Sequence, residues 1–308
     1  MTGTREIPME LIAEIQRLKT ARNAVILAHN YQRPEVQDIA DFVGDSLELS
    51  IKASKLTDID VIEFCSVDFM GETAKLLAPT KTVLLPDPQA GCPMADMVTP
   101  EGLRALKAQY PGVPVVCYVN TSAAVKAECD ITCTSANAVK VVNSLPGDTV
   151  IFAPDQCLGA WVQRHTEKKL ILWEGYCPTH NRILPEHIAA QRAAHPGAEV
   201  MIHPECPMEL LEMAEHVVST GGMVRVAKES PATAFIVATE EGMLHRLRKE
   251  NPDKQFFHSA ATAICPNMKK TTLEKVLWSL QDLQTPVSIP DAVADRARQA
   301  IERMIALS

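Results

Sequence analysis

Short apolar runs, each ending in polar residues, recur three times along the chain. The first run, Ala24–Ala28, is apolar throughout and predicts a buried strand. It is followed by His29 and Tyr31, and a hydroxyl side chain follows 17 residues after the histidine, at Ser46. The same spacing returns with Tyr118, Asn120 and Ser135, and again with His203, Glu205 and Thr220. A fixed long period of this kind indicates one structural unit repeated three times.

Each repeat continues with a helical pattern and two further apolar runs that predict strands. The last run of each repeat leads into a loop that carries a Cys-Pro pair. These loops contain Cys92, Cys177 and Cys265, which are 85 and 88 residues apart. Because strands alternate with helices, we predict an α/β fold of three repeated three-layer α/β/α units with parallel sheets. Packing of the units around a pseudo-threefold axis would bring all the polar strand ends to one central site.

Helical patterns between the repeats set the expected boundaries. The expected units are residues 1–95 together with 269–308, residues 96–180, and residues 181–268. Thr99 before Pro100 predicts a capped helix that links the first two units. A second linking helix is predicted at Pro185–His195. Helices at Pro8–Arg22, Thr272–Gln281 and Asp291–Leu307 are expected at the two ends of the chain.

Composition limits the class of protein. A chain of 308 residues can form three small units with proper cores, and its 46% hydrophobic and 22% charged residues are typical of globular proteins. The net charge of −8 argues against a nucleic-acid partner, because such binding depends on clusters of Lys and Arg. The sequence has no signal-peptide pattern and no apolar run of about 18 residues. We therefore expect a cytoplasmic protein with no membrane span.

Nine cysteines without signs of secretion argue against a disulfide framework and leave a metal site or buried thiols. Three cysteines on equivalent loops suit an iron–sulfur cluster or a zinc ion. A structural zinc site would need a fourth Cys or His, whereas three ligands leave one metal position open for a substrate. Among the other cysteines, Cys206 is a rival ligand at a strand end, ranked below the repeated three. Buried packing is the favoured role for Cys65, Cys117, Cys129 and Cys133, and an auxiliary metal pair is the alternative for Cys129 and Cys133.

The polar pairs alternate along their strand ends, so both members of a pair face the same side. A single strand-end His or Tyr is usually structural, but three matched pairs predict a cavity lined with acids, bases and hydrogen-bond donors. The hydroxyls at Ser46, Ser135 and Thr220 have two open explanations. They can cap helix N-termini, or they can bind an anionic substrate together with free N–H groups. These features favour an enzyme that dehydrates or condenses a small polyanion.

Seven stretches resemble the quinolinate synthase family, in order and over essentially the whole chain. They are HNYQRPEVQDIADFVGDS, DFMGETAK, GCPMAD, YVNTSAAVKAECDITCTSANA, GYCPTH, HPECP and VSTGGM. The resemblance implies a transferase-type condensation of iminoaspartate with dihydroxyacetone phosphate. The products would be quinolinate, phosphate and water, on the route to NAD, and L-aspartate oxidase would supply the iminoaspartate. It also implies an oxygen-sensitive [4Fe–4S] cluster whose fourth iron meets the substrate.

The resemblance also implies roles for individual residues. Cys92, Cys177 and Cys265 would be the cluster ligands. Tyr31 and Glu205 would form an acid–base pair. His29, His180 and His203 would lie near the substrate, and Tyr118, Asn120, Ser135, Thr220 and Ser46 would contact carboxylate and phosphate groups. The chain departs from the expected family pattern at Ser66 and Gly71.

Two other functions fit the same residues. A zinc-dependent sugar-phosphate lyase could use three thiolates and anion pockets, and would contain zinc without sulfide. A non-catalytic iron–sulfur sensor would not need acid–base pairs at three strand ends, and it should not respond to small dianions.

Overall fold

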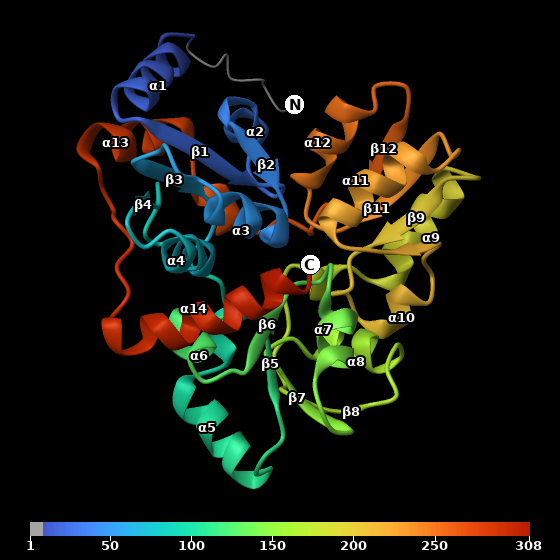
Figure 1. Ribbon diagram of the computed structural model, residues 1–308. Coiled ribbons are helices and arrows are strands. Elements are labelled where there is room, and N and C mark those ends of the chain that lie inside the picture. Colours follow the sequence, from blue (N-terminus) through green and yellow to red (C-terminus); the bar gives the residue numbers. More distant parts are fainter. Residues whose placement is uncertain (1–8) are drawn as a thin grey trace.

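The computed structural model describes residues 9–308, which form three four-stranded parallel sheets with helices between the strands (Figure 1). The first sheet consists of β1 (Ala24–His29), β2 (Phe42–Gly44), β3 (Val61–Cys65) and β4 (Thr82–Leu84). The second consists of β5 (Val115–Tyr118), β6 (Ile131–Cys133), β7 (Thr149–Ala153) and β8 (Lys169–Leu172). The third consists of β9 (Glu199–Ile202), β10 (His216–Val217), β11 (Ala234–Ala238) and β12 (Gln255–His258). The strand orders β2-β1-β3-β4, β6-β5-β7-β8 and β10-β9-β11-β12 are equivalent, so the predicted α/β fold of three repeated units is confirmed.

Helices occupy the same places in each repeat. The first unit contains α1 (Met9–Ala21), α2 (Pro34–Ile39), α3 (Ser46–Ser54) and α4 (Asp68–Leu77). The second contains α5 (Pro100–Gln109), α6 (Ala123–Lys126), α7 (Ala138–Ser144) and α8 (Gln156–Gln163). The third contains α9 (Pro185–Ala194), α10 (Met208–Leu211), α11 (Thr220–Glu229) and α12 (Met243–Glu250). The chain closes with α13 (Leu273–Asp282) and α14 (Asp291–Ala306), and short 3-10 helices η1 (Ala95–Met97), η2 (His180–Arg182) and η3 (Met268–Lys270) follow the three Cys-Pro pairs.

Alternating side chains on the central strands explain the three layers. Ile26 of β1 packs with α1, α2 and α13 on one face of the first sheet, and its neighbour Leu27 packs with α3 and α4 on the other. Both faces are apolar because helices cover both, as expected for a parallel sheet. In the second and third sheets the central strands likewise divide their side chains between separate apolar clusters.

The helices at the chain ends hold the first two units together. The predicted cap of α5 is present, since Thr99 Oγ1 accepts a hydrogen bond from Gly102 N. Thr272 caps α13 in the same way, with Oγ1 accepting from Lys275 N. Helix α13 packs on α1 and β3 of the first unit, whereas α14 packs on α4 and on α6 and β6 of the second (Figure 1).

The unit boundaries given above stay a prediction. The expected start of the first helix at Pro8, and the absence of a signal peptide, fall on residues outside the described part of the chain.

Two features differ from the sequence-based expectation. Each unit has four strands rather than three, because β2, β6 and β10 are edge strands of only two or three residues, too short for periodicity to reveal. Cys117 and Cys129 were expected to be packed thiols, but they form a disulfide. The turn after α6 returns the chain to β5 and places their Cα atoms 6.1 Å apart, within the usual range for a disulfide.

No helix among residues 9–308 is both long enough and apolar enough to cross a membrane.

Candidate active site

The carboxyl ends of the strands of all three sheets meet at one central cavity of about 170 Å³. One water molecule needs a cavity of only about 10–15 Å³, so this space can hold a ligand of many atoms. The structure brings every candidate site residue to its walls. These residues are His29, Tyr31, Ser46, Cys92, Tyr118, Asn120, Ser135, Cys177, His180, His203, Glu205, Thr220 and Cys265.

The three cysteine loops share one backbone geometry. In each loop the N–H four residues after the cysteine donates to the cysteine carbonyl oxygen and closes one α-helical turn, which overlaps the 3-10 helix of that loop. The donors Asp96, Asn181 and Lys269 lie 3.2, 3.0 and 3.3 Å from the oxygens of Cys92, Cys177 and Cys265. Pro at the position after each cysteine fixes φ where such a turn begins.

A second repeated contact seats each loop on its own unit. In each unit, β3, β7 or β11 leads into the following helix, and one backbone N–H at this junction donates to the carbonyl two residues before the cysteine. These hydrogen bonds run from Asp68 to Ala90, from Gln156 to Gly175 and from Glu241 to Ala263, at 2.8, 2.8 and 3.1 Å. The repeat therefore sets the position of all three cysteines by the same means.

The environment of the three sulfur atoms suits metal-bound thiolates. Burial raises the pKa of the thiols of Cys92, Cys177 and Cys265. A backbone hydrogen bond from the residue three positions later opposes this and lowers each pKa; the donors are Ala95, His180 and Met268. Thiolates at such sites require a compensating positive charge, which a metal supplies. Backbone hydrogen bonds to sulfur are also a feature of iron–sulfur sites, so these residues fit such a cluster.

A second set of possible metal ligands shares one of these cysteines. Cys177 Sγ, His180 Nδ1 and a Glu205 carboxylate oxygen lie within 4.8 Å of one another. A Cys, His and carboxylate set is typical of a single zinc ion. However, His180 Nδ1 lies 2.9 Å from Glu205 Oε2, so the two groups already form an ion pair or hydrogen bond.

His29 and His203 have the same tautomer for the same reason. The backbone N–H of Tyr31 donates to His29 Nδ1 at 3.1 Å, and that of Glu205 donates to His203 Nδ1 at 3.3 Å. Nδ1 is therefore an acceptor in both rings, and Nε2 carries the hydrogen. Burial lowers the pKa of each histidine to about 3. Both rings are thus neutral hydrogen-bond donors, and His203 Nε2 lies 3.2 Å from Ser135 Oγ.

A continuous chain of polar contacts joins two tyrosines across the cavity. Tyr31 Oη lies 2.5 Å from Thr239 Oγ1, which lies 2.8 Å from His180 Nε2. His180 Nδ1 contacts Glu205, whose other oxygen accepts a 2.5 Å hydrogen bond from Tyr118 Oη. Sequence reasoning missed Thr239, although it directly follows strand β11 just as the other polar residues follow their strands. Such a chain can carry protons between its members.

Glu205 carries the negative charge in this chain of polar contacts. Burial raises its pKa, but the contacts with His180 and the hydrogen bond from Tyr118 oppose this and lower it below its ordinary range. Burial and the negative charge of Glu205 raise the pKa values of Tyr31 and Tyr118. Glu205 is therefore an ionised proton acceptor between two protonated phenols.

The three hydroxyl residues at the helix starts line the cavity, but they do not cap their helices. The caps of α3 and α11 are the preceding residues Asp45 and Ser219, so capping by Ser46 or Thr220 is wrong. Asn137 occupies the cap position of α7, two residues after Ser135. Thr220 Oγ1 accepts a 2.9 Å hydrogen bond from Asn30 Nδ2, and Ser135 Oγ contacts His203, so contact of these hydroxyls with a bound anion stays a prediction.

A model of the family described as quinolinate synthetase A protein matches residues 13–306. The chain belongs to the quinolinate synthetase A family. It is 57% identical to a quinolinate synthase of Methanoregula boonei over 96% of this chain and 97% of that protein. It is 58% identical to a quinolinate synthase of Dehalococcoides mccartyi over 96% and 98% of the two chains. It is 56% identical to a quinolinate synthase of Methanosarcina barkeri over 97% of this chain and 98% of that protein.

Cys206, the rival ligand, packs away from the cavity. Its side chain is fully buried in an apolar cluster with α9 and α10, and its Sγ lies 3.8 Å from the carbonyl oxygen of Ala238. We expect Cys206→Ser to keep the full metal content, because no cavity wall is changed. Iron and zinc analysis of the purified variant checks this, and loss of metal would make Cys206 a ligand.

Protonation of two histidines that are buried in the folded state is expected to contribute a loss of stability to the metal-free protein from about pH 6.5 downward. The pKa of His29 and His203 is about 3 in the folded state and about 6.5 in the unfolded chain. Between these values the unfolded chain binds more protons, so stability falls as the pH falls, by about 1.4 kcal/mol per pH unit for each histidine. Glu205, whose pKa is lowered, acts in the same direction below its ordinary pKa of 4.5. Glu63 and Asp155, whose pKa values burial raises, act in the opposite direction, so the contribution of a histidine is measured by comparison with a variant that lacks it.

Urea unfolding between pH 7.5 and 5 measures this dependence. His203→Gln should lower the slope by about 1.4 kcal/mol per pH unit relative to the unmodified protein, because it removes one buried neutral ring. The same slope in both proteins would contradict the neutral state of His203 in the folded chain.

Proposed function

We propose that this chain is a quinolinate synthase that condenses iminoaspartate with dihydroxyacetone phosphate. The products are quinolinate, phosphate and water, and the reaction, of the transferase type, belongs to NAD biosynthesis. The observation that carries the proposal is one cavity, in a member of this family, that combines three equivalent cysteine loops with an ionised Glu205 between two phenols.

Cys92, Cys177 and Cys265 would hold a [4Fe–4S] cluster. Three protein ligands leave one iron free, and such an iron supplies Lewis acidity toward a hydroxyl or nitrogen of the substrate. The equivalent 3-10 turns and backbone hydrogen bonds of the three loops support this ligand set.

The other residues would bind the substrates and move protons. Glu205 accepts a proton from the carbon or nitrogen that must lose one, and Tyr31 supplies a proton to a leaving hydroxyl. Thr239 and His180 link these two groups and allow the proton to return. A protonated phenol suits an acid and an ionised carboxylate suits a base, in agreement with the directions of their pKa shifts.

Neutral donors would bind the anionic groups. The Nε2–H groups of His29 and His203 can donate to carboxylates without bringing a proton that titrates near neutral pH. The hydroxyls of Ser46 and Thr220 stand at the first residues of α3 and α11 and line the same cavity, where they can donate to an anion. Tyr118, Asn120 and Ser135 complete this wall. Iminoaspartate brings two carboxylates and dihydroxyacetone phosphate one phosphate, which matches these donors.

The substrate defines the enzyme that must act before this one. Iminoaspartate would come from an oxidase acting on L-aspartate, which links the chain functionally to L-aspartate oxidase. Its place of action would be the cytoplasm.

An anaerobic assay tests the proposal. Protein reconstituted with iron and sulfide is incubated with iminoaspartate and dihydroxyacetone phosphate, and quinolinate is measured by chromatography. The proposal expects quinolinate and phosphate in equal amounts. If the Cys177, His180 and Glu205 group instead holds zinc for a lyase reaction, zinc-loaded protein without sulfide should cleave a sugar phosphate and form no quinolinate.

A further inference from the structure

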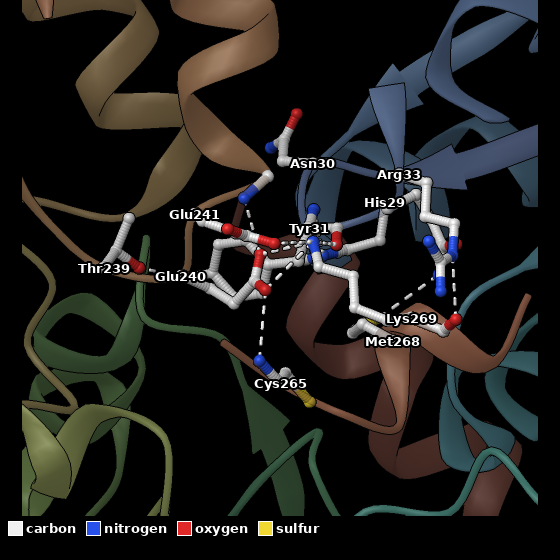
Figure 2. A network of polar contacts seen from close by, with 12 residues as sticks. His29, Asn30, Tyr31, Arg33, Thr239, Glu240, Glu241, Cys265, Met268 and Lys269 are labelled. Carbon is white, nitrogen blue, oxygen red and sulfur yellow. Dashed lines mark hydrogen bonds and ion pairs between the residues drawn. The ribbon is translucent and has the colours of Figure 1, made fainter. Parts of the chain in front are cut away.

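Lys269 reaches from the third cysteine loop to the catalytic strand end of the first unit. It is the fourth residue after Cys265 and lies in η3. Its Nζ donates a 2.8 Å hydrogen bond to the carbonyl oxygen of Tyr31 and lies 3.0 Å from a carboxylate oxygen of Glu240 (Figure 2). Its side chain is only 12% exposed, so both contacts lie mostly out of solvent.

Glu240 connects this ammonium group to the ligand loop. Its carboxylate is fully buried and accepts hydrogen bonds from Cys265 N at 3.1 Å and from Gly242 N at 2.7 Å. The Glu240 carboxylate therefore holds the backbone of Cys265. Its counter-ion, Lys269, holds the backbone of Tyr31. The residues equivalent to Lys269 in the other two loops are Asp96 and Asn181, so this connection belongs to the third loop alone.

The backbone of Tyr31 is also enclosed from the third unit. A Cβ atom at Gly242 would lie 2.7 Å from the carbonyl carbon of Tyr31, so only glycine permits this approach. Gln37 Nε2 donates to the carbonyl oxygens of both Gln32 and Gly242, at 2.8 and 2.9 Å. In return, Arg33 Nε donates to the carbonyl oxygen of Lys269 at 2.9 Å (Figure 2). The two segments thus hold each other in both directions.

We propose that Lys269 is a positioning residue that, together with Glu240, couples the placement of Tyr31 to that of the Cys265 loop. Removing the ammonium group leaves a buried carboxylate without its partner and frees the Tyr31 carbonyl, so both segments should loosen together. The consequence for turnover rests on the proposed function, because it requires Tyr31 to act on the substrate. The mechanical coupling does not depend on that function.

Hydrogen–deuterium exchange on metal-free and reconstituted protein measures the coupling directly. Lys269→Met fills the same space without a charge, Lys269→Arg keeps a cation and its donors, and Lys249→Met is the matched control. Lys249 also joins the third unit to the first, through a 2.6 Å ion pair with Asp38, but its side chain is 61% exposed and far less enclosed. We expect exchange in residues 29–33 and 263–269 to rise about tenfold in Lys269→Met and to be restored by Lys269→Arg. Lys249→Met should leave both segments unchanged.

Kinetics on the same variants separates positioning from a general loss of structure. Lys269→Met should lower kcat more than it changes KM, with recovery in Lys269→Arg. If Lys269→Met does not fold, Glu240→Gln keeps the size of the side chain and removes its charge, and it should raise exchange in the same two segments. Unchanged exchange in residues 29–33 in the variant that folds would overturn the proposal. Coupled exchange in a protein that makes no quinolinate would instead overturn the proposed function and leave the coupling intact.

Discussion

Cys177→Ser is expected to abolish quinolinate formation and to remove most of the bound iron. Cys177 lies beside the chain of polar contacts that joins Tyr31 to Tyr118, with its Sγ 3.1 Å from His180 Nδ1. A serine hydroxyl has a far higher pKa than a thiol and is a poor ligand for iron in a cluster, which is held by thiolates. Iron and sulfide analysis, visible absorbance and the quinolinate assay on anaerobically prepared protein measure the effect.

Cys206→Ser is the matched control for this experiment, because it makes the same chemical change in a buried cysteine outside the cavity wall. It should retain both iron and activity. Full iron content and full activity in Cys177→Ser would show that the three repeated cysteines are not the ligand set.

Tyr31→Phe is expected to keep the iron content and to lower kcat by about 10²–10⁴-fold, the usual contribution of an acid–base residue. The phenyl ring fills the same space, but it removes the hydroxyl that contacts Thr239 at 2.5 Å. The chain of polar contacts that begins at Tyr118 would then end at Thr239. Steady-state kinetics with both substrates, together with iron analysis, measures the change.

Tyr110→Phe serves as the control, since Tyr110 ends helix α5 on the surface and is 39% exposed. It should have the kcat of the unmodified protein. Normal turnover in Tyr31→Phe would remove the Tyr31 hydroxyl from the mechanism, and loss of iron in that variant would assign it a structural role.

Long, strictly repeated patterns made most of the fold predictable. Central strands such as Ala24–His29 are buried on both faces, so they read as unbroken apolar runs, and the spacing from His29 to Ser46 showed that the unit repeats. Because parallel strands bring their carboxyl ends to one edge of a sheet, residues at those ends could be assigned to one site from the sequence alone.

The features that were missed depend on contacts between residues far apart in the sequence. Thr239 matters because Tyr31 and His180 approach it from other units, and no local pattern reports that meeting. The disulfide depends on the return of the chain after α6, which the 12-residue spacing of Cys117 and Cys129 alone does not specify. The caps at Asp45 and Ser219 were misplaced by one residue, the usual uncertainty of a helix boundary.

The most direct test of the central claim is the metal content of anaerobically purified protein, with the EPR spectrum of its reduced form recorded before and after addition of quinolinate. We expect about four iron and four sulfide per chain. The spectrum should shift on addition, because an iron of the proposed cluster without a protein ligand would face the cavity in which Tyr31 and Glu205 lie. Zinc without sulfide, or a spectrum that quinolinate does not alter, would contradict the account.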